Sequence, residues 1–506
     1  MSEDIPKVRP INLIPVETGP KLVKSIEVLF QSDKDYFGEH WESRFLEQLR
    51  FDVIKTAVIE YPYVDQEFTS CYYGLYIRRH GYIPKYCIRI HFFSCEIKSV
   101  MELSEKRQPD YLGFTVIRPI GGKKNVSKTF LSARALRGTE GSRHCYATYS
   151  ANLFGIKFEV DSFPFMSQDG ELSRCAHASS WMLHRHFSQL FPHYQELRLF
   201  ELIELANEPL TTRSVPSRGL TADQCLILQK RCGFYPEVVS KQVDGKDDIP
   251  RFQKILFTYL DSNLPVIGAI KDTGRNRGHA MCLVGLGKDI PDKHLCFQAN
   301  KPFQFPTETV LVHDDNFLPM KPIPIEKIED DGEYGLENLD FIIVPLTEKL
   351  YLNAQKVFHV FDRIYSRNLT NLKQKIPKDK LWWKAYVTRG ATLRAKLRTM
   401  DSRFQSLKKH LMVRPLPKYV WVIEGGHVSH TKEGKVNFRW VIDSTARPEE
   451  LSPWIFLHDF EKSIFNDRRL QTTIRTTKID LDSKLKRLTL DNFQFDGLST
   501  SMKVVQ

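Results

Sequence analysis

Several features that would place a chain in a familiar class are missing from these 506 residues. No stretch approaches the roughly 18–20 consecutive apolar residues that a membrane-spanning helix needs. The first twenty residues lack a basic start followed by an apolar run, so we expect no signal peptide and a cytoplasmic protein. The sequence also shows no internal repeat and no low-complexity tract.

Motifs for binding metals and phosphates are missing as well. The nine cysteines include no CxxC pair, which excludes a zinc ribbon and a thioredoxin-type motif. His177, His184 and His186 fall on one predicted helix, but without an HExxH pattern we expect core or exposed histidines there. The segment IGGKKN at 120–125 is not a phosphate-binding loop and predicts a simple turn. We therefore expect no metal and no organic cofactor.

What is present is a foldable composition with an uneven charge. Hydrophobic residues make up 42% of the chain, enough for two to four domains with packed cores. The formal net charge of +12 is concentrated in residues 351–413, which hold fifteen Lys or Arg and three Asp or Glu. Such a segment either binds nucleic acid or an acidic protein, or is a solvated helical face.

The pattern of apolar residues predicts an α+β chain in four parts. Residues 1–160 are β-rich after a helical stretch at 23–57, and residues 161–350 place helices before strands. Residues 351–413 are basic and are predicted to be helical, and residues 414–506 contain strands again. Within 161–350 the predicted helices cover 175–191, 194–206, 221–233 and 248–262, and the predicted strands cover 264–270, 279–287, 308–314 and 342–346.

Two patterns in the C-terminal parts have alternative interpretations. The pair Trp382–Trp383 is flanked by Lys380 and Lys384, so it either stacks on nucleic acid bases or lies in a core. The segments WVIEGG and WVIDST place Glu424 and Asp443 after apolar runs, which is typical of strand-end acids at a sheet rim and also of paired acid/base catalysts.

One stretch carries chemistry: FPFMSQDGELSRCAHASSWML, at 163–183. Cys175 opens an apolar helix, and the start of a helix lowers the pKa of a thiol. Gln168 precedes it by seven residues and can donate its side-chain amide to an oxyanion. Further along, His279 begins a strand and can act as a base, and Asp314 follows the strand VLVH and can orient it, with Asp315 as the alternative.

This order of Gln, Cys, Gly-His and Asp resembles the papain-like cysteine peptidases. With Asp in third place it is most similar to the bacterial branch that cleaves bacteriocin leader peptides at double-glycine sites. The resemblance covers about 161–346 and rests on the segments QD, CAHA, GHA and HDDN. The chain departs from that pattern in its seven-residue Gln-to-Cys spacing, in Ala176, and in the 35 residues between His279 and Asp314, where 288–308 reads as an insertion.

The resemblance implies a papain-like core of helices packed on an antiparallel sheet. It implies a peptidase acting on a peptide or protein substrate, with Cys175 as nucleophile, His279 as base, Asp314 as orienting group and Gln168 in the oxyanion hole. An acyl-transferase or deamidase using the same residues, and a non-catalytic protein that binds through 351–413, stay open as alternatives. The oligomeric state stays open too.

Overall fold

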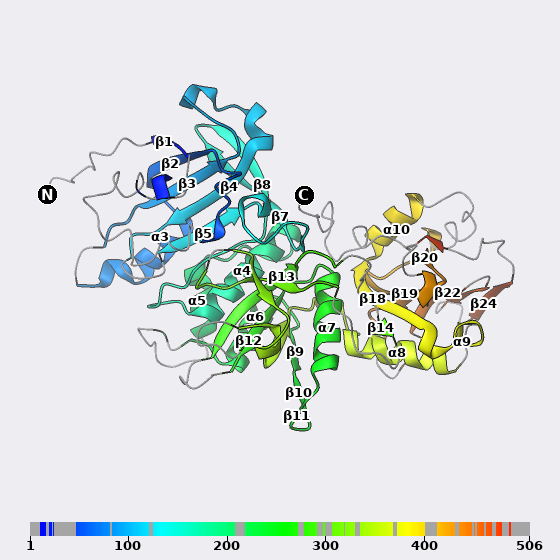
Figure 1. Ribbon diagram of the computed structural model, residues 1–506. Coiled ribbons are helices and arrows are strands. Elements are labelled where there is room, and N and C mark those ends of the chain that lie inside the picture. The colour runs from blue at the N-terminus through cyan, green and yellow to red at the C-terminus, as the bar shows by residue number, and fades with distance from the viewer. Residues whose placement is uncertain are drawn as a thin grey trace, which may run out of the picture.

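The computed structural model divides the chain into three neighbouring units along the sequence (Figure 1). It describes residues 11–16, 20–22, 24, 47–80, 83–120, 125–207, 217, 219–271, 278–290, 297–298, 306–317, 319–328, 334–367, 372–399, 412–430, 435–447, 450, 453–459, 462–467, 472–477 and 485–486. All strand pairs in these ranges are antiparallel, which confirms the α+β class. Among the described residues, no helix combines the length and apolarity needed to cross a bilayer.

The described part of the N-terminal unit contains a five-stranded sheet, the helix α3 (Gln66–Gly74) and a hairpin. The strands run in sequence order: β1 (Ile11–Pro15), β2 (Thr56–Tyr63), β3 (Cys87–Phe93), β4 (Tyr111–Ile117) and β5 (Val126–Leu131). Helix α3 (Gln66–Gly74) leads into a short 3-10 turn, η2 (Tyr76–Arg78). The hairpin β7 (Ala147–Leu153) and β8 (Ile156–Ser162) buries Phe158 and Val160 on one side, as the alternation in the sequence predicts. Most of the predicted helix at 23–57 lies outside the described residues, and the prediction is wrong for its described end, where Leu49 forms a β-bridge with Leu136 and β2 begins at Thr56.

The central unit follows the predicted order of helices before strands, except that the edge strand β9 (Glu237–Ser240) precedes the last helix and was not predicted. The helices are α4 (Cys175–Leu190), α5 (Leu199–Asn207), α6 (Ala222–Arg231) and α7 (Ile249–Asp261). The sheet has the order β16 (Lys321–Pro324), β15 (Thr309–His313), β13 (His279–Leu286), β12 (Val266–Ile270), β17 (Phe341–Val344) and β9 (Glu237–Ser240). Thr221 caps α6 through a reciprocal pair of hydrogen bonds with Gln224, as expected.

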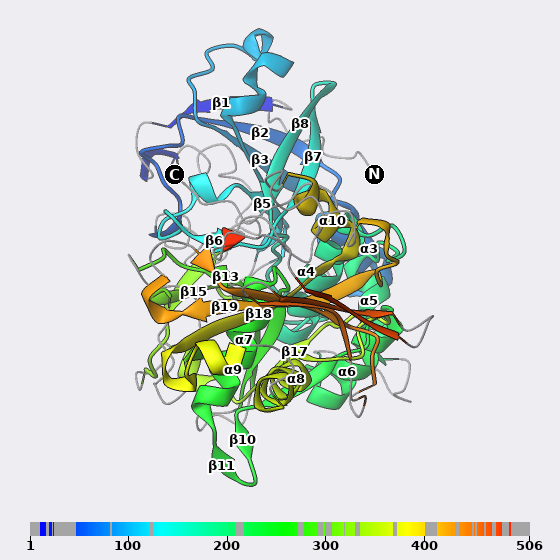
Figure 2. The ribbon, with the colours of Figure 1, turned by 90° about the vertical axis from the view of Figure 1, so that its right-hand side faces the viewer.

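Two short strand pairs extend this unit. The strand β6 (Arg143–His144), which belongs by sequence to the N-terminal region, pairs with β13. The N-terminal region therefore contributes a strand to the central sheet before its own last hairpin is complete. The hairpin β10 (Gln242–Val243) and β11 (Lys246–Asp247) projects away from the molecule, as Figure 2 shows.

The C-terminal unit is a second large sheet. Its order is β14 (Phe297–Gln298), β18 (Leu381–Arg389), β19 (Tyr419–His427), β21 (Phe438–Asp443), β22 (Trp454–Asp459), β23 (Lys462–Asp467) and β24 (Thr472–Thr477). The helices α8 (Ala354–Ser366), α9 (Leu372–Lys375) and α10 (Gly390–Thr399) belong to this unit, and β20 (Lys435–Val436) pairs with β25 (Leu485–Lys486). The first strand, β14, lies within the predicted insertion at 288–308.

Two predictions for the C-terminal parts are wrong. The segment Leu381–Arg389 is a buried strand instead of a helix, because both of its faces are covered. Trp382 and Trp383 are buried within it, so they form core and present no surface for stacking on bases. Glu424 lies inside β19, where it pairs with buried cations, whereas Asp443 does end its strand. Residues 400–411 of the basic segment lie outside the described residues.

Candidate active site

Cys175 is the first residue of α4 and is partly exposed. The backbone N–H groups in the first turn of a helix have no partner within the helix, and they carry the positive end of its dipole. The first turn of α4 contains no acidic residue to oppose that charge. The Cys175 side chain therefore lies at the positive end of this helix dipole.

Packing of α4 on β13 brings His279 to the same end of the unit as Cys175. The Ser179 hydroxyl donates to the carbonyl oxygen of Ala280 at 3.2 Å, and the Cys282 thiol donates to the carbonyl oxygen of Ser179 at 3.1 Å. Ser179 lies one helical turn after Cys175, and Ala280 directly follows His279. Cys175 and His279 therefore meet where the helix and the strand both begin.

His279 is held between a thiol and a carboxylate. Its Nε2 lies 3.1 Å from Oδ1 of Asp314, which leaves Nδ1 for the thiol. Burial acts to lower the pKa of His279, but the charge and hydrogen bond of Asp314, together with the hydrogen bond and charge of Cys175, raise this pKa well above its ordinary 6.5. The imidazole therefore carries a proton at neutral pH and can pair with a thiolate.

Asp314 is buried, and both of its carboxylate oxygens accept hydrogen bonds. The backbone N–H and side-chain amide of Asn316 donate to its Oδ1 at 2.8 and 3.0 Å, and the Tyr334 hydroxyl donates to its Oδ2. Burial acts to raise the pKa of Asp314, but the charge of His279 and these hydrogen bonds hold it well below its ordinary 3.8. Asp315 is also buried, and the ion pair with His279 is made by Asp314.

Gln168 is buried in the loop that connects β8 to α4. Its carbonyl oxygen, and that of Ser167, each accept a hydrogen bond from one guanidinium nitrogen of the buried Arg118, at 2.7 and 2.8 Å. The next residue, Asp169, uses its Oδ1 to accept the backbone N–H of Glu171, Leu172 and Ser173 at 2.8–2.9 Å. The loop in front of the nucleophile is therefore fixed from two directions.

Sequence reasoning missed three residues here: Tyr334, Asp169 and Arg118. Tyr334 is 20 positions from Asp314 in a polar stretch, and Arg118 is 50 positions from Gln168. No local spacing links residues that far apart. The turn around Asp169 had a signal, because an Asp followed directly by a Gly is favourable turn chemistry.

The three histidines on α4 are core side chains. His184 Nε2 donates to the carbonyl oxygen of Gln195 at 2.7 Å, His177 Nδ1 accepts the N–H of Arg174 at 3.3 Å, and the His186 ring lies 4.7 Å from that of Phe163. Burial lowers the pKa of His177 to about 4 and that of His186 to about 3. They are therefore neutral at pH 7.

One group of residues can offer ligands to a metal. His279, Asp314 and Asp315 each provide a ligand atom, and these atoms lie within 4.8 Å of one another. Two of the three already form the ion pair described above, and Asp314 also accepts from Asn316 and Tyr334. A cation here would have to displace the proton of His279, so the arrangement suits a base and its orienting group better than a metal.

Comparison with protein-family models and with curated proteins finds no match to this chain.

Proposed function

We propose that this chain is a cysteine hydrolase with a papain-like core that acts on a peptide or isopeptide bond. One observation carries the proposal: a partly exposed Cys at the start of a helix and a buried aspartate interact with the same histidine. A structural cysteine needs none of these partners. Perturbed titratable groups gathered around a nucleophile are typical of catalytic sites.

In the proposed mechanism the Cys175 thiolate attacks the carbonyl carbon of the substrate. The negative charge that develops on the carbonyl oxygen is stabilised by the Cys175 N–H and the side-chain amide of Gln168. The oxyanion then reforms the carbonyl and expels the amine, which takes the proton of His279. Neutral His279 next removes a proton from water, and the resulting hydroxide equivalent releases the acyl group as a carboxylic acid.

The same first half-reaction serves an acyl-transferase or a deamidase, in which an amine replaces water or ammonia leaves. Hydrolysis is the form we propose, because the resemblance to peptidases points to it. The alternative that 351–413 binds nucleic acid is weakened, since Trp382 and Trp383 are buried and cannot stack on bases. The peptidase proposal, with a peptide or protein as the binding partner, therefore takes first place.

Alkylation by iodoacetamide, followed by mass spectrometry, tests this proposal without knowledge of the substrate. We expect Cys175 to be labelled at neutral pH at least tenfold faster than Cys95, another partly exposed thiol, whose pKa is raised chiefly by burial. His279→Ala should slow the labelling of Cys175 and leave that of Cys95 unchanged. Equal labelling of the two cysteines, or indifference to His279→Ala, would contradict an activated Cys–His pair.

A further inference from the structure

The loop that carries Gln168 to Cys175 is held mainly by the N-terminal unit. Arg118 follows β4 directly, and its guanidinium donates hydrogen bonds to the carbonyl oxygens of Ser167 and Gln168. Arg118 is only 2% exposed, so water cannot take the place of these hydrogen bonds when they break. A buried charge-assisted hydrogen bond is stronger and more directional than an exposed one.

A second contact from the same unit reaches the turn after Gln168. The hydroxyl of Tyr76, in η2, donates to Oδ2 of Asp169 at 3.0 Å, while Oδ1 of Asp169 holds the turn that leads to Cys175. Burial, and then the charge of Asp169, raise the pKa of Tyr76 far above its ordinary 10.0, so the hydroxyl remains a donor at any physiological pH. The backbone N–H of Asp169 in turn donates to the Ser173 hydroxyl at 2.9 Å.

These contacts hold the loop between the two residues that would form the oxyanion hole, Gln168 and Cys175. Arg118 fixes the backbone of Gln168 itself, and Tyr76 with Asp169 fixes the turn that ends one residue before α4. All three side chains line one buried space between the two units, together with Glu67 and Cys71. A shift of the N-terminal unit would therefore move Gln168 relative to Cys175.

We propose that Arg118 and Tyr76 are positioning residues, through which the N-terminal unit sets the geometry of the oxyanion hole. The inference rests on the proposed function and adds a role for residues outside the central unit. Donors to an oxyanion must lie within about 0.5 Å of their productive positions, and a displacement of about 1 Å can slow a reaction roughly 100-fold. The Cys–His pair itself lies on α4 and β13 and needs neither contact.

Two reactions of Cys175 separate positioning of the oxyanion hole from activation of the thiol. Acylation by p-nitrophenyl acetate passes through a tetrahedral oxyanion, and its burst of p-nitrophenolate reports that step. Alkylation by iodoacetamide forms no oxyanion and reports only the thiolate. Both are measured on the full chain, with Cys175→Ala subtracted as background.

The informative variant is Tyr76→Phe, which removes one hydroxyl and keeps the ring. Its matched control is Tyr111→Phe, since the Tyr111 hydroxyl is also buried in the N-terminal unit but bonds Nδ1 of His91 at 2.8 Å, away from the loop. We expect Tyr76→Phe to slow acylation by about 5- to 20-fold relative to alkylation, and Tyr111→Phe to leave the ratio of the two rates unchanged.

A second pair of variants tests Arg118. Arg118→Met removes both hydrogen bonds, and Arg118→Lys retains a donor that can reach one carbonyl oxygen. We expect the loss in acylation to be larger for Met than for Lys, with alkylation preserved in the folded protein. If Tyr76→Phe and Tyr111→Phe show the same ratio while wild-type Cys175 is activated, this inference fails and the proposed function stands. If wild-type Cys175 is not activated, the proposed function fails first.

Discussion

The two outer units are attached to the central unit by different kinds of contact. The N-terminal unit uses hydrogen bonds from Arg118 and Tyr76 to the loop in front of Cys175. The C-terminal unit uses buried charges and aromatic rings that meet α7. The first attachment acts on the loop that leads to the nucleophile, and the second acts on other elements.

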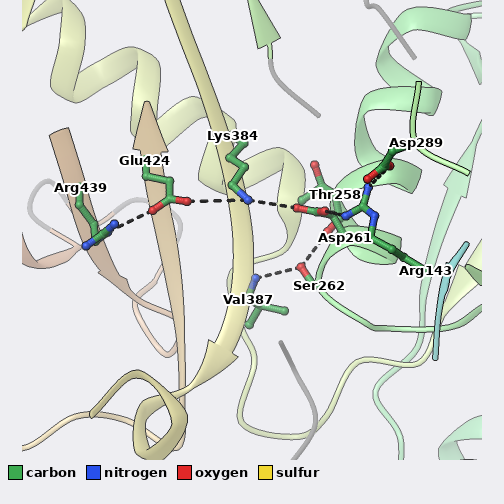
Figure 3. A network of polar contacts seen from close by, with 9 residues as sticks. All are labelled: Arg143, Thr258, Asp261, Ser262, Asp289, Lys384, Val387, Glu424 and Arg439. Atoms are coloured by element: carbon green, nitrogen blue, oxygen red, sulfur yellow. Dashed lines mark hydrogen bonds and ion pairs between the residues drawn. The ribbon is translucent and has the colours of Figure 1, made fainter. Parts of the chain in front are cut away.

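The charges at the C-terminal attachment form one chain of ion pairs (Figure 3). Lys384, on β18, lies 3.6 Å from Asp261 at the end of α7 and 3.7 Å from Glu424 on β19. Arg143 contacts Asp261 at 3.2 Å, and Arg439 contacts Glu424 at 3.1 Å. All five side chains are at most 4% exposed, so each depends on its neighbours for compensation of its charge.

Beside this chain, α7 inserts a lysine into an aromatic cage. The ammonium of Lys254 lies 4.4 Å from the ring centroids of Phe297, Phe358 and Trp383, which come from β14, α8 and β18. Faces of aromatic rings attract a cation, and the attraction grows when water is excluded. One residue of the central unit thus binds three elements of the C-terminal unit.

The central unit is therefore contacted differently by its two neighbours. We expect changes at the N-terminal attachment to alter rates and changes at the C-terminal attachment to alter stability.

The largest effect is expected from Lys384→Met. Removing this cation leaves two buried carboxylates with one partner fewer, which costs about 3–5 kcal/mol in the free energy of unfolding. Urea denaturation measures the loss, and Lys157→Met, in an exposed pair with Glu159 at 2.7 Å, should cost less than about 1 kcal/mol. The alkylation rate of Cys175 in the folded variant should be unchanged; a slower rate would break the distinction.

The next effect is expected from Asp314→Asn, which acts on the site itself. Without the carboxylate the pKa of His279 falls, the imidazolium supports the thiolate less, and alkylation of Cys175 at pH 6 should slow about tenfold. The midpoint of the alkylation profile should move up by about one pH unit. An unchanged profile would show that Asp314 does not orient or charge His279.

The same substitution has a defined pH window for stability. The raised pKa of His279 stabilises the folded chain fully below pH 6.5, and this contribution is lost as the pH rises through the folded-state pKa. The lowered pKa of Asp314 stabilises it fully above pH 3.8 and is lost as the pH falls. The stability difference between wild type and Asp314→Asn should therefore be largest between these two values, at about 1–2 kcal/mol.

The smallest effect is expected from Lys254→Met. Burial lowers the pKa of Lys254 to about 8, against the charge of Asp362, which raises it. In the unfolded chain Lys254 keeps its proton up to its ordinary pKa of 10.5, so the free energy of unfolding of the wild type should rise between pH 8 and pH 10. We expect a rise of about 1 kcal/mol, because the attraction of the rings for the ammonium offsets part of the effect of burial. The variant should lack this rise, and Lys157→Met should keep it. A rise retained in Lys254→Met would exclude the caged lysine as its source.

Local signals in the sequence predicted the elements of the central unit well. The cap at Thr221 and the apolar run that begins at Cys175 each gave a helix with the right start, because a cap or a change of period is encoded within a few residues. Cys175, His279 and Asp314 were selected as candidates by the same kind of local signal, because each lies at or next to a terminus of a predicted helix or strand.

Contacts between distant parts of the chain could not be predicted. Leu381–Arg389 has helix-like neighbours and one lysine, Lys384, yet it is a central strand because β14 and β19 pair with it on both sides. Arg118 and Tyr334 act on residues that are adjacent only after folding. Local propensity carries no information on such partners.

The strand β14 has a consequence for how the chain is made. It lies between the strand that begins with His279 and the strand that precedes Asp314, but its partner β18 is synthesised more than eighty residues later, with Phe297 opposite Trp383. A nascent chain that ends before β18 therefore exposes this segment without its partner, and an unpaired strand edge is a template for aggregation. We expect release of soluble, folded protein to await the emergence of β18 from the ribosome.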